Sequence, residues 1–515
     1  MDPTYLTLHS QAYYFLLFAL IIALLIYVPR ELYKSWRQSR PLPGLPLITL
    51  DGLNAKDSWI KHAEKVVQKG FDQCGDEPFQ IMTGTGPKVI LRARYLEEVS
   101  RNKATSLTEA LRPDFMLEHP GFEGMAFSFN NPKTLPEVVR TKLTQSLGII
   151  TEDLVEEATD SIHDIFGESE EWQTTKIKSD ALQMVARLSS RVFMGKPLCR
   201  DQRWLDIAKG YTVHIFSVQR ELRKISTWTR PIQYWFTKSC TEIRKEYRDA
   251  TNLINDEVAR RDVEAKSALA AGKKPAKKAD AIAWFVEYTN GTMSIKDLVD
   301  AQLSLTVAAI HTTSEATCVA LQHLCLHPEY FEPLRKEMIS VLSESGWAKT
   351  SLYKLSLLDS FLKESQRHDR GRTSILRYLT SPLTLSSGLH LPSGTRIILE
   401  SKFWDPNIYP DPTQFNPYRF LNAEKGKWSY VSTNSEHSGF GMGEHACPGR
   451  FFVANEIKIA MCFMLLKYEW EFCPEVGHVK PLRFEGVNSV DPKTVLRFRR
   501  RREEIDLENL PMSVR

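Results

Sequence analysis

Apolar residues recur every three or four positions along most of the chain, and this spacing predicts a largely helical protein. Between about residues 137 and 261 the spacing continues with few breakers, which is typical of a helix-rich body. A further long helix is predicted to begin after Ser294, a suitable N-cap with Asp297 at the third helical position, and to end before Pro328. At 1.5 Å per residue this helix would run about 50 Å, through the middle of a domain of this size.

Other segments carry strand and loop patterns. Two apolar runs about a glycine-rich turn in residues 79–91 predict a β-hairpin, and residues 374–399 alternate and turn like a small sheet. Residues 403–420, FWDPNIYPDPTQFNPYRF, predict an irregular but packed segment, and the lysine-rich residues 265–281 a solvated loop. The sequence therefore predicts a mainly α fold with a small β region.

An uncharged apolar run near the N-terminus predicts a membrane anchor. Residues 12–28 carry no charge, and about 20 helical residues span a bilayer core. A cleaved signal peptide is the alternative, but no basic segment precedes the run and no small-residue cleavage site follows it. Arg30, Lys34, Arg37 and Arg40 follow the run, so the positive-inside rule places the rest of the chain in the cytosol. We therefore expect an anchor at 1–28, a basic, proline-rich hinge at 29–46, and one domain at 47–515.

Composition narrows the possible functions. With 515 residues, 42% of them hydrophobic, the chain can bury a large core. A net charge of +4, from 67 basic and 63 acidic residues, creates no overall field for nucleic acid, so no nucleic-acid partner is expected. Eight cysteines without CxxC spacing argue against a disulfide framework and a zinc cluster, and fit a reducing compartment.

The segment HSGFGMGEHACPGR, residues 437–450, places Cys447 between a glycine-rich turn and an apolar helical pattern. If Pro448 is the first helical residue, Cys447 is the N-cap, and backbone amides and the helix dipole favour its thiolate. Gly443 would then permit the turn, Gly449 would let a flat ligand lie against the helix start, and Phe440 would cover one side of the sulfur.

Other interpretations of this cysteine remain. A buried cysteine in a turn is often inert. Zinc is a poor fit, because His437, His445 and Cys447 lack a fourth ligand at finger-like spacing. A nucleophilic cysteine needs a base held by a third group, which spacing alone does not show.

Two further clusters suggest chemistry or internal anchoring. AAIHTTS, residues 308–314, predicts either a close helix crossing with back-bonded hydroxyls or a helix opened beside a cofactor. Glu364 and Arg367, three residues apart, lie on one helical face. Such a pair is usually on the surface, but Arg419 could complete a buried network in which two guanidinium groups share one carboxylate.

Together these motifs resemble the cytochrome P450 family. FGMGEHACPG matches the haem-binding signature F-x-x-G-x-[HR]-x-C-x-G, KESQR matches E-x-x-R, and FNPYRF matches F-x-P-x-R-F. AAIHTT lies where that family has its oxygen-activating helix. The resemblance covers the chain from about residue 41 to the C-terminal strands, and implies the P450 fold with haem b in one catalytic domain at 47–515.

The resemblance also assigns roles to individual residues. It implies that Cys447 is the axial thiolate ligand of the haem iron and that Glu364, Arg367 and Arg419 form a structural triad. The implied scaffold and propionate partners of the haem are Phe440, Gly443, His445, Gly449, Arg377 and Arg140. Arg140 has an alternative as an ordinary exposed arginine, because Pro136 replaces the tryptophan often found four residues before it.

The chain departs from the family pattern [AG]-G-x-[DE]-T-[TS], because Ala309 replaces the glycine and His311 the acid. Thr312 matches the threonine that helps deliver protons during dioxygen activation. His311 is either part of an altered proton relay or a packed core histidine. Candidate pocket residues, with core packing as their alternative, are Phe115, Met116, Phe122, Phe127, Leu303, Val307 and Ala308.

The implied activity is that of a microsomal monooxygenase in the endoplasmic reticulum membrane, using O2 and electrons from a separate NADPH-dependent reductase, with cytochrome b5 a second candidate donor. No GxGxxG follows a strand, so this chain does not itself handle NADPH. The sequence is similar to fungal members of secondary metabolism, which implies an apolar, terpenoid or indole-terpenoid substrate. Alternatives are a haem-thiolate isomerase or peroxide-dependent enzyme, a haem sensor, and a zinc-binding membrane scaffold.

Overall fold

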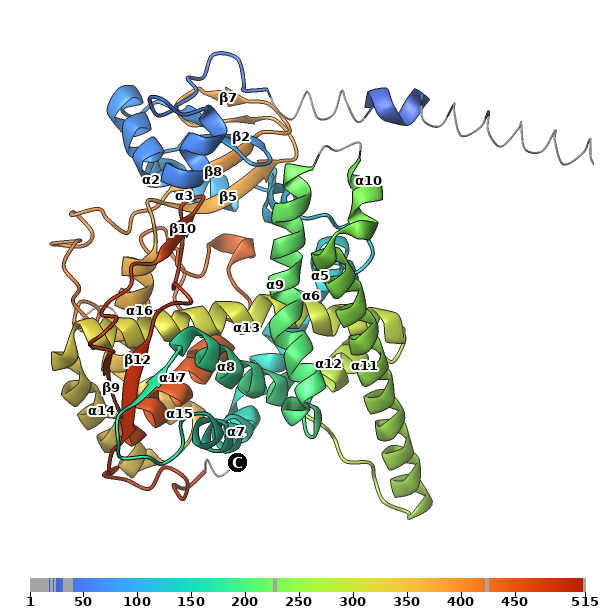
Figure 1. The fold of residues 1–515 in the computed structure, drawn as a ribbon, viewed down its shortest axis with the longest axis vertical. Helices are drawn as coiled ribbons and strands as arrows, with labels where there is room; N and C mark the ends of the chain where they lie inside the picture. The colour runs from blue at the N-terminus through green and yellow to red at the C-terminus, as the bar shows by residue number, and fades with distance from the viewer. Residues whose placement is uncertain are drawn as a thin grey trace, which may run out of the picture.

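The computed structural model describes residues 18, 22, 25–30, 40–225, 229–421 and 426–512. A large helical body carries a smaller sheet region at one end (Figure 1). The helices of the body are α5 (Glu123–Asn130), α6 (Thr134–Val138), α7 (Leu147–Phe166), α8 (Ile177–Phe193), α9 (Gln202–Lys224), α10 (Arg230–Gln233), α11 (Lys238–Ala270), α12 (Ala281–Tyr288), α13 (Ile295–Leu326), α14 (Phe331–Ser345), α15 (Lys349–Lys354), α16 (Ser356–Asp369) and α17 (Arg450–Lys467).

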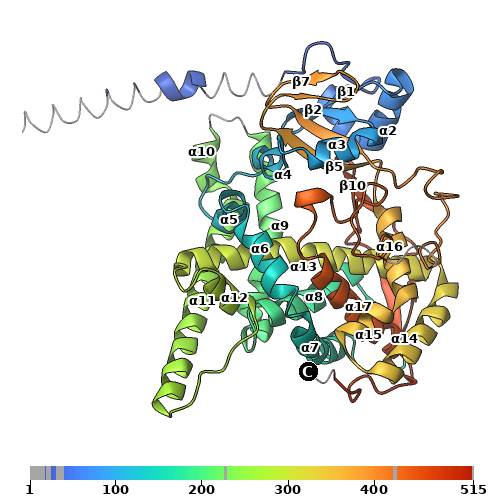
Figure 2. The ribbon, with the colours of Figure 1, turned by 180° about the vertical axis from the view of Figure 1, so that it is seen from behind.

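The main sheet has the strand order β1-β2-β8-β5-β3. Its strands are β1 (Phe79–Thr83), β2 (Gly86–Leu91), β3 (Thr105–Ser106), β5 (Thr373–Leu379) and β8 (Arg396–Glu400). β2 and β8 are parallel, with Ile90 opposite Ile398, and the other pairs are antiparallel. Helices α2 (Ala55–Cys74), α3 (Leu96–Arg101) and α4 (Leu107–Leu111) belong to this region (Figure 2).

Three smaller sheets complete the β structure. Their strands are β4 (Gln173–Thr175), β12 (Leu496–Arg500) and β9 (Tyr468–Phe472) in one, β10 (Leu482–Phe484) and β11 (Val487–Ser489) in the second, and β6 (Leu383–Thr384) and β7 (His390–Leu391) in the third. The predicted mainly α fold, the hairpin at 79–91 and the small sheet near 374–399 are thus confirmed.

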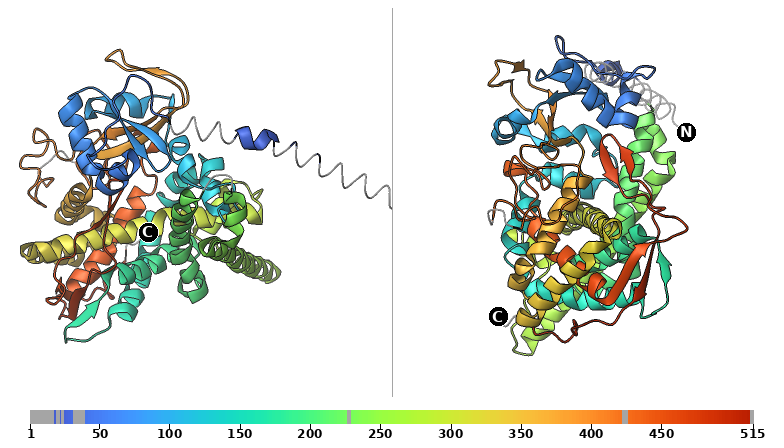
Figure 3. Two further views of the ribbon diagram at one scale, coloured as in Figure 1. Left: turned by 45° about the horizontal axis from the view of Figure 1, so that its top comes forward. Right: turned by 90° about the vertical axis from the view of Figure 1, so that its left-hand side faces the viewer.

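The long helix α13 crosses the middle of the body. As predicted, Ser294 is its N-cap and accepts a hydrogen bond from the Asp297 amide, and the helix ends before Pro328. The right-hand view of Figure 3 looks along this helix and shows other elements around it. Its 32 residues extend about 48 Å, and most of them are buried in the main hydrophobic core.

The centre of α13 is continuous, so the expectation of an opened helix is wrong. The Thr312 hydroxyl donates to the carbonyl oxygens of Ala308 at 2.8 Å and Ala309 at 3.2 Å. Since these bonds satisfy the hydroxyl locally, the threonine requires no break in the backbone. The alternative with back-bonded hydroxyls is therefore the one observed.

The lysine-rich loop is shorter than predicted. Helix α11 continues through Ala270, because alanine, leucine and lysine are strong helix formers, and only residues 271–280 are irregular. Most of the predicted anchor at 1–28 lies outside the described residues. Within the part of the chain that the structure describes, no helix combines the length and the apolar character needed to cross a bilayer.

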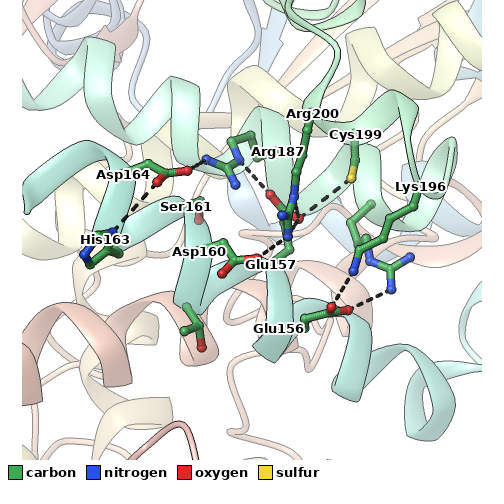
Figure 4. Close-up of polar contacts among 12 residues, drawn as sticks. Glu156, Glu157, Asp160, Ser161, His163, Asp164, Arg187, Lys196, Cys199 and Arg200 are labelled. Carbon is green, nitrogen blue, oxygen red and sulfur yellow. Dashed lines mark hydrogen bonds and ion pairs between the residues drawn. The ribbon is translucent and has the colours of Figure 1, made fainter.

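Buried ion pairs fasten the helices to one another. Glu157 of α7 is fully buried and accepts hydrogen bonds from Arg187 Nε of α8 at 2.6 Å and from Arg200 Nε at 2.8 Å (Figure 4). Arg187 Nη1 also donates to Asp164, seven residues or about two helical turns further along α7, at 2.6 Å. The carboxylate is thus matched by two guanidinium groups, which a buried charge requires.

The predicted network around Glu364 is present and confirmed. Glu364 and Arg367 are fully buried on α16, and Arg367 donates to both carboxylate oxygens at 2.8 Å. Arg419 Nε donates to the same carboxylate at 3.2 Å. Burial alone would raise the pKa of Glu364, but the hydrogen bonds from Arg367, the nearby His368 ring and the charges of both arginines lower it to about 2.

Arg367→Ala should lower the free energy of unfolding by about 3 to 5 kcal/mol, because it leaves the Glu364 carboxylate buried without its main partner. Because the folded-state pKa of Glu364 lies below 4.5, its stabilising contribution in the wild type is present above about pH 4.5 and is lost as the pH falls toward 2. Urea unfolding at neutral pH and across this acid range measures both effects. Lys354→Ala, which breaks the exposed pair with Glu344, is the control and should cost below about 1 kcal/mol. Wild-type stability in Arg367→Ala would show that the network does not hold the fold.

Candidate active site

The loop around Cys447 is held by backbone hydrogen bonds. The Cys447 N–H donates to the Phe440 carbonyl at 2.7 Å, and Arg450 Nη1 donates to the Cys447 carbonyl at 2.8 Å. Gly443 has a φ of +67°, and a Cβ there would lie 3.0 Å from the carbonyl oxygen of Ser100. Glycine is therefore needed for the turn, as predicted.

Helix α17 begins later than predicted. Its first residue is Arg450 and its N-cap is Gly449, so the expectation that Pro448 opens the helix with Cys447 as N-cap is wrong. Pro448 and Gly449 instead form a turn ahead of the helix. The backbone N–H groups of Gly449 and Arg450 still lower the pKa of the Cys447 thiol.

The protein by itself does not favour the Cys447 thiolate, contrary to expectation. Burial raises the pKa of the thiol, and this effect exceeds the opposing effects of the two amides and of the Arg450 charge. The cost of desolvating an anion in this loop therefore exceeds what the two amides and the Arg450 charge together offset. A cation at the sulfur would reverse the balance, since a metal-coordinating thiol is deprotonated outright.

The space beside the sulfur is suited to a flat group. At Gly449 the nearest atom to an added Cβ would be Val139 Cγ1, at 3.9 Å, so no side chain presses on the start of α17. Phe440 is half-buried and packs edge-on against Tyr430, with ring centroids 5.1 Å apart. Phe440 thus lies within the loop, between Tyr430 and the backbone of Cys447.

Arg377 of β5 is a buried guanidinium without an anionic partner among the described residues. Only 2% of it is exposed, and it donates hydrogen bonds to the carbonyl oxygens of Leu376 and Met442. Its Nε has no partner within the described part of the chain. Burial lowers the pKa of Arg377 to about 10. An anionic ligand group would satisfy this cation.

His445 and Arg140 lie near the same loop. Arg140, in the π-helical turn η3 (Val139–Leu143), is exposed and donates to the Glu444 carbonyl at 2.9 Å. Burial, together with the Arg377 charge, lowers the pKa of His445. The structure therefore brings His445, Arg140 and Arg377 to the same loop, although Arg140 keeps the exposure of an ordinary surface arginine.

The middle of α13 presents a small-residue face to a cavity. Ala308 and Thr312, one helical turn apart, are exposed although residues 301–307 and 313–314 are buried. Thr312 lines a cavity of about 420 Å³ that extends to Tyr430 beside the cysteine loop. Its apolar walls are Leu182, Phe216, Ala316, Val319, Leu362 and Val487, and its polar side includes Lys178, Glu315 and Asp369.

His311 also lines this cavity, but one of its ring nitrogens is engaged. Its Nε2 lies 2.8 Å from the carbonyl oxygen of Lys209 on α9. Because a carbonyl only accepts, Nε2 must carry the proton. Burial lowers the pKa of His311, so the neutral ring is favoured near neutral pH. The geometry is that of a histidine packed between two helices.

Most of the predicted pocket residues lie elsewhere. Phe115, Met116, Phe122, Phe127, Leu303 and Val307 belong to the main hydrophobic core, and none of them lines the described cavity. Phe115 contacts it indirectly, since its ring lies 5.9 Å from that of Phe216. Sequence reasoning missed Leu182, Phe216 and Val487, because they come from three distant segments, α8, α9 and β11, that converge only in the fold.

The residues present fit a haem group. Cys447 offers a soft sulfur ligand near two backbone amides, and Gly449 leaves space for a flat group. The buried guanidinium of Arg377 would pair with an anion such as a propionate. Among the described residues no cluster of three or more histidine, cysteine or acidic side chains is placed to hold another metal. The fold and this site together define the class of haem-thiolate proteins.

Comparison with known proteins agrees. The family model "Cytochrome P450" matches residues 58–498. The chain is 41% identical over 488 residues to cytochrome P450 monooxygenase bsc2 of Alternaria brassicicola, covering 91% of this chain and 92% of that protein. It is 40% identical over 438 residues to cytochrome P450 monooxygenase 1 of Gibberella fujikuroi, covering 84% and 99%. The protein belongs to the cytochrome P450 family and is an oxidoreductase of the monooxygenase type.

Cys447→Ser should abolish the long-wavelength absorption band of the reduced carbon monoxide complex, because a hydroxyl stays protonated near neutral pH and is a poor ligand for iron. Absorbance spectra of the purified or microsomal protein measure this loss. Cys74→Ser is the matched control, since Cys74 is also partly buried but lies on α2, away from the loop. A variant at position 447 that kept both the band and full turnover would exclude Cys447 as the ligand.

Proposed function

We propose that this protein is a membrane-anchored monooxygenase of fungal secondary metabolism that inserts one oxygen atom of O2 into an apolar terpenoid or indole-terpenoid. The observation that carries the proposal is the cavity that joins Thr312 of α13 to Tyr430 beside the Cys447 loop. The Thr312 hydroxyl and an apolar wall line this cavity, and its residue Tyr430 packs against Phe440 of the cysteine loop, which supports the proposal. Bound haem supplies the iron that activates dioxygen with two electrons.

The residues around that group then have distinct proposed roles. Cys447 ligates the iron, and Phe440, Gly443 and Gly449 shape the loop. Three hydrogen-bond donors hold the propionates, the arginines Arg377 and Arg140 and the imidazole of His445. The buried, otherwise unpaired guanidinium of Arg377 supports this assignment best, because a propionate would remove the cost of its burial.

Thr312 is the proposed proton-handling residue. In the overall reaction a C–H bond of the substrate becomes C–O–H, the second oxygen atom leaves as water, and two electrons and two protons are consumed. The Thr312 hydroxyl donates to the Ala308 carbonyl, so its lone pairs remain to accept a hydrogen bond from the cavity side. For His311 the bond to Lys209 supports the packed alternative over a relay.

The substrate proposal rests on the cavity and on the resemblance that the sequence shows to fungal members of the family. The walls formed by Leu182, Phe216, Val319, Leu362 and Val487 suit an apolar skeleton. The size of the cavity, about 420 Å³, is in the usual range for small-molecule sites.

Cellular placement is proposed from the sequence. Residues 1–28 would anchor the chain in the endoplasmic reticulum membrane, residues 29–46 would connect the anchor, and the catalytic domain, 47–515, would face the cytosol. An NADPH-dependent reductase would supply the electrons, with cytochrome b5 as a further donor. The exposed guanidinium of Arg140 beside the cysteine loop is one positive group that an acidic redox partner would contact.

Expression of the full chain with a reductase in microsomes, followed by mass analysis of products from a terpenoid panel, tests the proposal. A mass gain of one oxygen atom that requires both NADPH and reductase is expected. Product formed with peroxide alone would favour the peroxide-dependent alternative, and rearranged product of unchanged mass the isomerase. Haem-loaded protein that binds panel compounds but converts none would overturn the monooxygenase proposal.

Thr312→Ala should leave NADPH consumption in place but divert electrons to hydrogen peroxide, because a positioned acid–base group typically contributes about 10²- to 10⁴-fold. The ratio of product to NADPH consumed is the quantity to measure. Thr313→Ala is the matched control, because the Thr313 hydroxyl is buried and makes no hydrogen bond within the described residues. Unchanged coupling in Thr312→Ala would contradict the proposed role.

His311→Ala separates the two interpretations of that residue. A packed histidine should lower the melting temperature through loss of the Lys209 bond and leave the coupling ratio near that of the wild type, whereas a relay would uncouple as Thr312→Ala does. Differential scanning fluorimetry and the coupling assay give these two quantities on the same preparation.

A further inference from the structure

The cavity beside Thr312 is also lined by the carboxylate of Glu315, which has no part in the proposed function. Glu315 lies three residues after Thr312 on α13, so the two side chains share a helix face and their Cβ atoms are about 5 to 6 Å apart. Both residues line the same cavity of about 420 Å³. His311, directly before Thr312, offers no carboxylate, and its Nε2–H is directed at the Lys209 carbonyl.

Glu315 is held in place by a lysine and by a strand end. Its Oε2 lies 3.3 Å from Lys178 Nζ at the start of α8, and its Oε1 accepts a hydrogen bond from the Val490 N–H. Lys178 Nζ also donates to Ser489 Oγ at 2.7 Å and to the Val490 carbonyl at 2.6 Å. The carboxylate is therefore fixed from two sides at the edge of the cavity.

The pair is placed for exchange with solvent and contributes little to stability. The side chains of Glu315 and Lys178 are 24% and 29% exposed. An ion pair with that much solvent access typically contributes at most about 1 kcal/mol. Glu315 is thus held in one position, is in contact with solvent and lies one helical turn from Thr312. These are the properties that a residue carrying protons from solvent to Thr312 needs.

We propose that Glu315, positioned by Lys178, is the residue through which solvent protons reach the Thr312 hydroxyl. This inference rests on the proposed function of Thr312. Glu315 acts through Thr312 and is therefore a positioning and relay residue, separate from the groups that contact the haem.

The proton balance of the relay is simple. The Glu315 carboxylate takes a proton from solvent water or from the Lys178 ammonium, and the lysine is reprotonated from solvent. The protonated carboxyl group passes this proton through cavity water to the hydrogen-bonding position at Thr312 Oγ1. Each turnover sends two protons along this path, matching the two electrons from NADPH that reduce one oxygen atom of O2 to water.

Other charged groups also face this cavity. Asp369 of α16 has its pKa raised to about 6, chiefly by burial, and Arg370 lies beside it. His311 stays neutral because burial lowers its pKa. The charges of Glu315 and Lys178 also act on the pKa values of Asp369 and His311, so variants of the pair shift these groups as well. The coupling ratio at one fixed pH is therefore the primary measure of the proposed relay.

The test uses the full chain with reductase in microsomes and the panel terpenoid that gives the most product. In Glu315→Gln, which keeps the side-chain shape, the ratio of product to NADPH should fall at least about tenfold with hydrogen peroxide rising in its place. Lowering the pH from 8 to 6 should partly restore the ratio in this variant, and Glu315→Asp should retain more of it. Glu344→Gln, in the exposed pair with Lys354 at 3.4 Å, is the matched control.

A readout independent of turnover tests the pairing itself. Melting temperatures of Glu315→Gln, Lys178→Gln and the double variant should be non-additive, the double variant losing less than the sum of the single losses. Additive losses would overturn the pairing. A coupling ratio in Glu315→Gln within twofold of the wild type, while Thr312→Ala falls tenfold, would overturn the relay and leave the proposed function intact. Wild-type coupling in both Glu315→Gln and Thr312→Ala would overturn the proposed role of Thr312 and the relay with it.

Discussion

The carboxylate of Glu364 is the point on which the architecture behind the cysteine loop depends. Besides Arg367 and Arg419, it accepts the backbone N–H of Asn416 at 3.1 Å. Arg367 in turn donates through Nη1 to the carbonyl oxygens of Phe403 and Pro412 at 2.7 and 2.8 Å. Residues 403–420 have few regular backbone partners, so one buried ion pair supplies the hydrogen bonds that a strand or helix would otherwise provide.

This anchoring continues toward the site through buried polar contacts. His437, at the beginning of the cysteine loop, is fully buried, and its Nε2 donates to Gln366 of α16 at 3.0 Å. Its Nδ1 lies 3.3 Å from the hydroxyl of Tyr409, in the irregular segment. Helix α16 therefore fixes both the proline-rich segment and the loop, and Gln366 also lines the cavity. A substitution of Glu364 should therefore alter the position of the loop that carries Cys447.

Much of this framework was predictable because its signals are local. The N-cap at Ser294, the hairpin at 79–91 and the three-residue spacing of Glu364 and Arg367 each depend on neighbouring residues. The start of α17 was misplaced because Pro448 is compatible with either a first helical turn or a preceding turn, and the fold selects the second. The extension of α11 to Ala270 was missed because lysine charge suggested a loop where helix propensity decided the outcome.

The cavity was the least predictable part, because its walls come from segments that are far apart in the sequence and meet only after folding. Phe216, Val487 and Lys178 belong to no sequence motif, and they are recognised as cavity residues only because the fold brings them beside Thr312.

The pKa of the Cys447 thiol was also not predictable from the sequence. Sequence reasoning counts the amides near a sulfur but not the depth of its burial, and here burial raises the pKa more than the donors lower it. It follows that one ligand, cationic at its centre and anionic at its edge, would pair the buried Arg377 guanidinium and would also stabilise the thiolate form of Cys447. Haem binding and the stability of this loop should therefore be strongly linked.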